Sequence, residues 1–324
     1  MISTFGNNIK VSLFGESHGE YIGVTVSGLP SGVEVRMEEI NAELVRRRPQ
    51  GDLETKRIEN DELKIISGIY NGYTTGAPLT ILIKNNDVKS EKYLDGIMRP
   101  GTSDYPSYIR STGYADLRGG GHFSGRLTAP LVALYPFLRK ILNKKGIYIT
   151  TKVKESYNQG DDTAGFVSTV TIKGMPVGVG EPFFDSVESV LSHLLFAIPS
   201  VKGVSFGDFD IAMKKGNDVK DELSINDGEV KILSNHNGGI NGGLTNGNDI
   251  IINVSFKPIS SLSASQNTIN IKTKENVSYK NENRNDKSIV GRAQVIMEAV
   301  CAIGLYDLLV TYYGSNDLKW LKDV

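Results

Sequence analysis

The chain has 324 residues, with 36 Lys and Arg against 37 Asp and Glu, so its formal charge is −1. A nearly balanced chain has no global field that would attract nucleic acid or an acidic membrane, so a local cluster of basic residues must hold any anionic partner. The hydrophobic share of 39% and the charged share of 23% fit an ordinary globular protein and argue against disorder.

The cysteine count and the two most membrane-like segments favour a cytoplasmic protein. A single cysteine, Cys301, can form neither an internal disulfide nor a cysteine-based zinc site. The first ten residues lack the basic region and apolar run of a signal peptide. The most apolar stretch, 295–310, is short for a membrane span and is interrupted by Glu298 and Asp307, which indicates a core helix.

Hydrophobic periodicity predicts alternating strands and helices in the first half. In chain order, the predicted elements are strands at 10–14 and 21–26, a helix at 37–48, strands at 63–68 and 79–84, and an apolar helix at 128–144 with Pro136 inside it.

The second half predicts a similar series. Its elements are a strand at 169–173, a helix at about 186–196, a strand at 250–254 and a long core helix at 291–313. The polar segment 267–286 has little periodicity and predicts a long surface or active-site loop.

Two glycine-containing motifs occur twice and in the same order. Gly28-Leu-Pro-Ser-Gly-Val33 recurs as Gly174-Met-Pro-Val-Gly-Val179, and Gly72-Tyr-Thr-Thr-Gly76 recurs as Gly243-Leu-Thr-Asn-Gly247. Coincidence among turn residues is an open alternative for either pair alone, but two pairs in one order favour an internal duplication. We therefore expect one α/β domain over 1–324, made of similar halves at about 1–150 and 151–324 with pseudo-two-fold symmetry.

Two segments carry the strongest local signal, Arg99-Pro-Gly-Thr-Ser-Asp104 and Arg118-Gly-Gly-Gly-His-Phe-Ser-Gly-Arg-Leu-Thr128. The glycines of the second segment lead into a predicted helix, so backbone N–H groups would face an anion near the helix N-terminus. The segment lacks the Walker and dinucleotide-binding patterns, and the chain has no His-Glu-x-x-His metal motif. A set of tight turns without a ligand is the alternative for any one glycine cluster.

His18 and the arginine run at 46–48 each allow a functional and a structural interpretation. A loop histidine flanked by glycine can reach a ligand and transfer a proton near neutral pH, or it can simply bond a nearby carbonyl. The three arginines suit phosphate and carboxylate recognition, but cations at a helix C-terminus are also favoured by the helix dipole.

Taken together and in order, these motifs resemble the chorismate synthase family over nearly the whole chain. The matching segments are Phe14–Gly19, Arg46–Pro49, Ser67–Pro78, Arg99–Gly101, Arg118–Thr128, Asn237–Gly247, Lys257–Ser261 and Arg284–Asp286. The resemblance implies a sandwich of helices between antiparallel sheets and a homotetramer. It also implies a phosphate lyase that converts 5-enolpyruvylshikimate 3-phosphate to chorismate, in the shikimate pathway to aromatic amino acids, with reduced FMN and no net redox change.

The resemblance also implies roles for individual residues. His18 would protonate or hold the departing phosphate, and Asp286 would assist proton removal. The substrate, which carries a phosphate and two carboxylates, would contact Ser17, Arg47, Arg99 and Arg126. The flavin would contact His122, Phe123, Ser124, Gly243, Lys257, Pro258, Ile259, Ser260, Ser261 and Arg284.

Three departures from the family pattern leave other functions open. Thr102 stands where the family usually has a second catalytic histidine, so either the rate is lowered or another group such as His122 covers that role. His122 itself stands where the family usually has an arginine. Leu53 lies near the place of a further substrate arginine, for which Lys56 or Arg57 could substitute. The alternatives are a non-catalytic or very slow flavin- or anion-binding paralogue, and a bifunctional flavin reductase and synthase. A separate flavin reductant is expected because no nicotinamide fingerprint is present.

Overall fold

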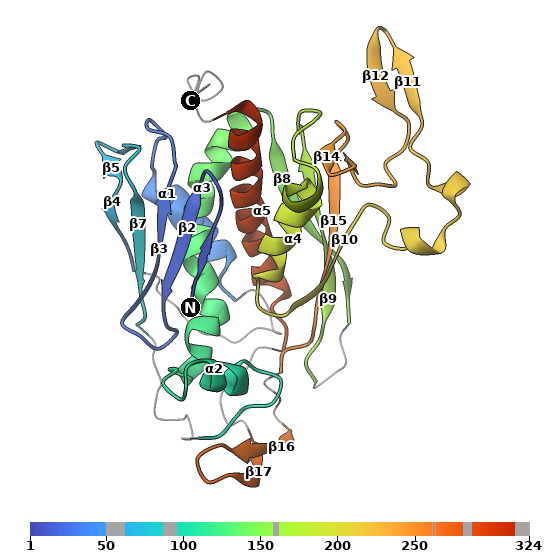
Figure 1. Cartoon of the computed structure of the whole chain (residues 1–324). Helices are drawn as coiled ribbons and strands as arrows, with labels where there is room; N and C mark the ends of the chain where they lie inside the picture. The colour runs from blue at the N-terminus through green and yellow to red at the C-terminus, as the bar shows by residue number, and fades with distance from the viewer. Residues whose placement is uncertain are drawn as a thin grey trace.

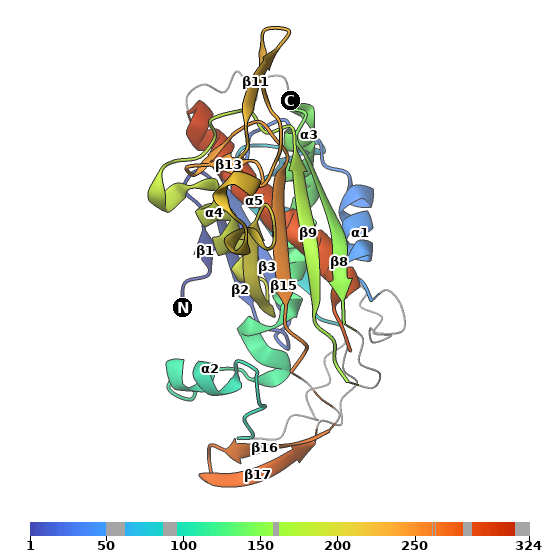
Figure 2. The same cartoon turned by 90° about the vertical axis from the view of Figure 1, so that its right-hand side faces the viewer.

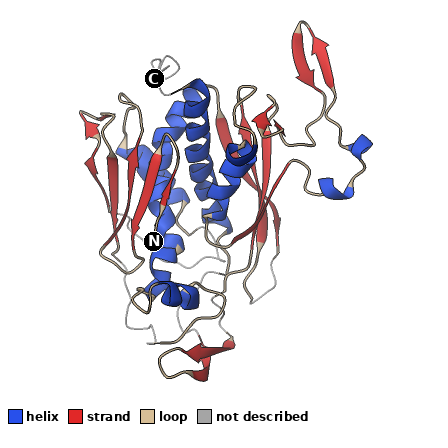
Figure 3. Ribbon diagram, viewed as in Figure 1, coloured by secondary structure: helices blue, strands red, loops and turns tan. Residues whose placement is uncertain are grey.

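The computed structural model describes residues 1–49, 62–86, 96–157, 162–260, 262, 264–280 and 287–314. Within these ranges, a layer of helices lies between two antiparallel sheets (Figures 1 and 3). The predicted α/β sandwich is therefore confirmed.

The first sheet has the strand order β1-β2-β3-β7-β4 with all neighbours antiparallel. Alternating apolar side chains such as Ile22, Val24 and Ile81 are fully buried, as expected for a sheet with one face on a core. The bounds are β1 Thr4–Phe5, β2 Lys10–Gly15, β3 Tyr21–Ser27, β4 Leu63–Ser67 and β7 Leu79–Lys84.

The second sheet has the order β10-β15-β9-β8, again antiparallel throughout. Phe166 and Phe256 pair across β9 and β15, and their rings stack with centroids 4.4 Å apart. The bounds are β8 Tyr148–Ser156, β9 Phe166–Lys173, β10 Val201–Phe206 and β15 Ile250–Phe256.

Four helices form the middle layer: α1 Met37–Arg46, α3 Ala129–Lys144, α4 Val187–Phe196 and α5 Val290–Tyr313. Ser186 caps α4 by accepting a hydrogen bond from the backbone N–H of Ser189. By length and composition α5 could cross a membrane, but 94% of its most apolar stretch is buried inside the protein. Cys301, in the middle of α5, is fully buried, and this burial raises the pKa of its thiol.

The two halves of the chain use the same order of elements. The series β2-β3-α1-β4-β7-α3 corresponds to β8-β9-α4-β10-β15-α5, and the sheet orders β2-β3-β7-β4 and β8-β9-β15-β10 match position by position. This agreement is what an internal duplication would produce, and the duplication itself stays a prediction.

Two threonines at equivalent positions, Thr74 and Thr245, form hydrogen bonds with the repeated glycine motifs. Thr74 accepts a hydrogen bond from Val33 N (2.9 Å) and donates to Pro30 O (2.6 Å). Thr245 accepts from Val179 N (2.9 Å) and donates to Pro176 O (2.5 Å). Each threonine lies in a two-stranded ribbon, β5 Ile69–Tyr70 with β6 Tyr73–Thr74, or β13 Ile240–Asn241 with β14 Leu244–Thr245.

Most predicted elements agree with the structure to within a few residues, but the expected loop at 267–286 is wrong over its described part. Residues 265–280 form a hairpin of β16 Ser265–Asn270 and β17 Glu275–Lys280. Asn270 closes its turn by accepting from Lys272 N (3.0 Å) and Thr273 N (3.2 Å), and Met98 N donates to Ile269 O (3.1 Å). Side chain–backbone bonds and pairing with a distant segment thus stabilise a polar sequence as a hairpin.

Two additions stand out from the sandwich in both side views (Figures 1 and 2). At one end lie the short helix α2 Asp104–Arg110 and the β16–β17 hairpin, and at the other end a second hairpin projects away from the body. This second hairpin, the arm, consists of β11 Leu223–Asn226 and β12 Glu229–Ile232. Short 3-10 turns complete the fold: η2 Arg118–Phe123, η3 Gly125–Thr128, η4 Phe183–Asp185, η5 Ile211–Met213 and η6 Gly216–Asp218.

Candidate functional site

The loop between β2 and β3, residues 16–19, carries Ser17 and His18 and is here named the histidine loop. Ser17 N donates to Gly121 O (3.0 Å), which ties the loop to the glycine-rich segment. Asn85, directly after β7, donates from its side chain to Glu16 O (3.1 Å) and Gly19 O (2.8 Å). The loop is therefore held at both ends, and the His18 side chain is buried.

Opposite the histidine loop lies the glycine turn, residues 119–121. Its three glycines have φ of 60°, 85° and 55°, a region that other L-residues rarely occupy. A Cβ at Gly119 would lie 2.7 Å from His18 Nε2 and 2.8 Å from Ser17 Oγ. The predicted catalytic residue His18 and the predicted substrate contact Ser17 therefore both pack directly on the Gly119 backbone.

Two of the predicted arginines converge on the residues that follow the glycine turn. Arg47 is buried and donates to Thr128 Oγ1 (3.1 Å) and Gly125 O (2.9 Å). Arg126 donates from Nε to Asn85 Oδ1 (3.1 Å) and from Nη2 to Lys84 O (3.3 Å). The structure thus brings Arg47 and Arg126 to the same end of the sandwich as His18.

The neighbouring Arg46 has a different, structural environment. It forms a bidentate pair with the buried Glu298 (2.7 and 2.8 Å) and also contacts Glu43 (2.7 Å). The hydrogen bonds to Glu298 raise the pKa of Arg46, so its charge is fixed. Of the two adjacent arginines, Arg46 therefore belongs to an ion network with Glu43 and Glu298, and Arg47 belongs to the candidate site.

Arg99 links this region to the loop before α2. Its guanidinium forms two 2.7 Å bonds with the buried Asp104 and reaches Leu117 O, one residue before Arg118, at 3.3 Å. Thr102 donates to Arg99 O (2.9 Å) and accepts from Asp104 N (3.3 Å), so its hydroxyl serves the backbone of this loop.

Lys257 and Ser260 join the other half of the molecule to the same loop. The Lys257 ammonium donates to Gly101 O (3.0 Å) and to Ser260 Oγ (2.6 Å), and Ser260 Oγ donates to Gly101 O (2.9 Å). The segment after β15 and the segment before α2 are thereby fixed against each other.

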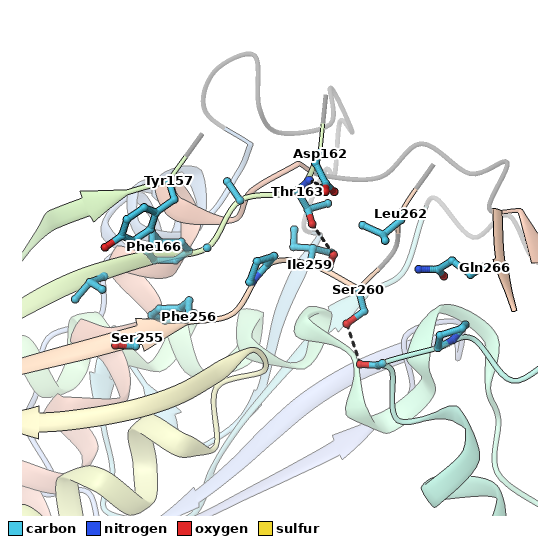
Figure 4. Close-up of a pocket in the computed structure, with 16 residues that line it drawn as sticks. Tyr157, Asp162, Thr163, Phe166, Ser255, Phe256, Ile259, Ser260, Leu262 and Gln266 are labelled. Carbon is cyan, nitrogen blue, oxygen red and sulfur yellow. Dashed lines mark hydrogen bonds between the residues drawn. The ribbon is translucent and has the colours of Figure 1, made fainter. Parts of the chain in front are cut away.

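A cavity of about 710 Å³ opens beside this junction (Figure 4). Phe166 and Phe256 form part of its wall, and Ile259, Ser260 and Gly101 line its edge. Figure 4 shows Ser260 bonded to Gly101, and Thr163 bonded to Ile259 O at 2.9 Å. Its size and mainly apolar lining with a few fixed polar groups are typical of a small-molecule site.

The structure does not bring all predicted residues together. Gly243 lies against Ser186 at the N-terminal end of α4, beyond the start of β15, whereas Lys257 follows the end of β15. The seven residues of β15 separate these ends by about 20 Å. Ser261, Arg284, Asp286 and Leu53 lie outside the described residues.

Phe123 and Ser124 occupy the chain just after the glycine turn. The Phe123 ring is exposed and lies edge-on to His122, with centroids 6.3 Å apart. Ser124 Oγ accepts from Arg126 N (3.3 Å) and so caps the short turn that leads into α3. The glycine turn is therefore joined to α3 by the short 3-10 turn η3, not directly as the sequence suggested.

Sequence reasoning missed Asn85 and Asp116. Hydrogen bonding to Arg118 lowers the pKa of the Asp116 carboxyl against an opposing effect of burial, and the nearby His18 lowers it further. Asp116 therefore places a fixed negative charge near His18. The sequence signal that could have identified Asn85 is its position immediately after a strand that ends at this edge of the sheet.

The fold and these side chains define an α/β sandwich protein with a group of basic residues at one end of its helical layer. The family model for chorismate synthase matches residues 9–160 and 151–310. The chain is 40% identical to the chorismate synthase of Chitinophaga pinensis over 330 residues, covering 97% of this chain and 98% of that protein. It is 39% identical to that of Pyrococcus abyssi over 345 residues, covering 94% and 97%.

The fold comparison agrees with the sequence comparisons. A crystal structure of a chorismate synthase superposes with a TM-score of 0.76 at 24% identity, covering 98% of this chain and 96% of that chain. The chain belongs to the chorismate synthase family of enzymes.

Proposed function

We propose that this protein is a phosphate lyase that eliminates phosphate from 5-enolpyruvylshikimate 3-phosphate to form chorismate, with reduced FMN as cofactor and no net redox change. The observation that carries the proposal is that Arg47 and Arg126 bond the residues around the glycine turn and the histidine loop, while Arg99 bonds the chain just before that turn. A phosphate and two carboxylates need several fixed cations, and planar guanidinium groups suit both kinds of anion.

The proposed chemistry breaks the C–O bond to phosphate and removes a proton from the ring carbon across the ring. Arginines held by protein carbonyls and carboxylates are already oriented, so they stabilise the negative charge that develops on the leaving phosphate. We propose that His18 protonates or holds this phosphate and that Ser17 contacts the substrate; their shared packing on Gly119 supports a common site. Asp286 is proposed to assist proton removal.

The residues around the cavity fit a flavin. Phe166, Phe256 and Ile259 offer apolar surface for a ring system, and Lys257 and Ser260 offer a cation and a hydroxyl at the edge. We propose that Pro258, Ser261, Arg284, Phe123 and Ser124 complete this site. When bound, reduced FMN would supply transient electron density to the substrate ring.

We also propose a homotetramer, and the position of Gly243 agrees with it. Gly243 lies about 20 Å from the Lys257 segment along β15, so it would contact a flavin only from a second copy of the chain. A cytoplasmic location and a separate flavin reductant belong to the same proposal.

Thr102 favours a second candidate function, a non-catalytic or very slow flavin- or anion-binding paralogue. Its hydroxyl bonds the backbone at Arg99 and Asp104, and threonine has no imidazolium to donate a proton. If the family's second histidine is indispensable, a chain with threonine here binds its ligands without turnover.

One assay separates the two candidates. The protein is mixed anaerobically with the substrate and photoreduced FMN, and chorismate absorbance and free phosphate are followed. We expect turnover by the wild type, and a His18→Ala variant that folds but loses at least about 100-fold in rate, because general acid catalysis contributes about 10²–10⁴-fold. Binding of FMN without turnover, restored by Thr102→His, would instead support the paralogue.

A further inference from the structure

We propose that His122 is a positioning residue that holds the histidine loop in place, and that it is neither an acid–base group nor the replacement for the histidine missing at position 102. This inference rests on the proposed function. It starts from the two ring nitrogens of His122, which both have protein partners.

The first partner of His122 is the backbone of β2. Its Nδ1 lies 2.8 Å from Gly15 O, and Gly15 is the last residue of the strand, two residues before Ser17. A carbonyl oxygen only accepts hydrogen bonds, so Nδ1 carries the proton and donates it.

The second partner is the N-terminal segment. His122 Nε2 lies 2.7 Å from the hydroxyl of Ser3, one residue before β1. In the neutral ring Nε2 accepts from this hydroxyl, and in the charged ring it donates to it, because a hydroxyl can play either part. These two hydrogen bonds of His122, here named the clamp, therefore exist in both charge states. Because both ring nitrogens are engaged in them, neither is available to exchange a proton with a reacting atom.

The clamp acts on the residues proposed to do the chemistry. His122 fixes the strand end before the histidine loop, the adjacent Gly121 O accepts from Ser17 N (3.0 Å), and Asn85 bonds both ends of the loop. Since His18 and Ser17 pack on Gly119 with no room for a methyl group, a small displacement of the loop changes their position against the substrate. A misplacement of about 1 Å can lower a rate about 100-fold.

Two variants of His122 distinguish positioning from proton transfer. In His122→Asn the side-chain amide can still donate to Gly15 O, whereas His122→Ala removes both bonds. We expect kcat to fall about 10- to 100-fold in His122→Ala and to recover to within about 5-fold of wild type in His122→Asn, with the pH profile of kcat unchanged. We expect Ser3→Ala, which removes only the second bond, to lie near His122→Asn.

A readout that needs no turnover keeps this test separate from the proposed function. Amide hydrogen exchange of residues 15–19 is expected to accelerate in His122→Ala and to stay near wild type in His122→Asn. If exchange at the loop is equal in the two variants and the wild type, or if His122→Asn is as slow as His122→Ala, the positioning role is wrong. If the wild type itself forms no chorismate, the lyase proposal fails. The exchange data still test whether His122 holds the histidine loop in place.

Discussion

Three consecutive glycines, 119–121, meet different demands although all have positive φ. A Cβ at Gly121 would lie 1.9 Å from Asp116 O, so backbone packing excludes any side chain there. A Cβ at Gly119 would strike His18 and Ser17, whereas the nearest atom to one at Gly120 is Ser124 Cβ at 3.6 Å. Backbone packing therefore requires glycine at position 121, and the contact with His18 and Ser17 requires it at position 119. At position 120 only the backbone conformation favours glycine.

This difference predicts the effect of adding one methyl group. Gly119→Ala and Gly120→Ala both place alanine in the left-handed region, which costs about 1–2 kcal/mol in each case. Only Gly119→Ala should displace His18 and Ser17, so we expect its rate of chorismate formation to fall at least about 10-fold further than that of Gly120→Ala. Thermal unfolding and steady-state assays check this expectation, and equal rates in the two variants would contradict it.

Sequence reasoning identified residues by type, but it could not identify the partners that orient them. Ser17, His18, Arg47 and Arg126 stood out because hydroxyl, imidazole and guanidinium groups suit an anion. Asn85 did not, because an amide at the end of a strand is common. Its importance arises from a contact with Arg126, 41 positions away, and sequence spacing does not report such contacts.

At the scale of elements, the repeated motifs at 28–33 and 174–179 are held by the same threonine bonds in both halves. Thr74 and Thr245 are each buried, and each bonds two backbone groups of its motif. Replacement by valine keeps the shape but leaves a backbone N–H unpaired, at a cost of about 1–3 kcal/mol.

We therefore expect Thr74→Val and Thr245→Val to lower the free energy of unfolding by similar amounts, about 1–3 kcal/mol each. The two sites lie in different halves and share no partner, so the double variant should show the sum within about 0.5 kcal/mol. Urea unfolding measures all three values. A loss confined to one threonine would indicate that the halves are not equivalent in energy.

Elements with buried, periodic side chains were predicted well, and those that depend on long-range pairing were not. The helices at 37–46 and 129–144 and the strands at 21–27 and 79–84 follow their apolar patterns. The β16–β17 hairpin is rich in Asn, Ser and Lys, and the bridge between Ile97 and Asn270 that anchors it joins residues far apart in the sequence. No local pattern could show that pairing.

At the scale of the whole molecule, the two ends of the sandwich carry different features. The predicted site residues that come together do so at the end where α3 and α5 begin, and the arm projects from the opposite end. The arm places Leu223, Ile225 and Val230 on one face, exposed by 69%, 75% and 67%. An isolated two-stranded ribbon is marginal in water, so a covered apolar face would stabilise it.

We expect a second copy of the chain to cover this face in the proposed tetramer. The charged pair of the arm, Lys231 with Glu229 (2.8 Å), lies on the opposite face together with Ser224, so two apolar faces can meet without burying these charges. Ile225→Lys should therefore shift the assembly to smaller species in light scattering. Ser224→Lys, on the other face of the same strand, should leave the mass unchanged, and an equal response of both variants would contradict the interface.

The position of the lone thiol has a practical consequence for studies of this protein. Cys301 lies in the middle of α5 and is fully buried, so an alkylating reagent can reach it only when the packing around this helix opens. The rate at which this thiol is modified in the wild-type chain then reports how often the core around α5 opens to solvent. A cysteine added at the surface would react first and could carry a probe of its own.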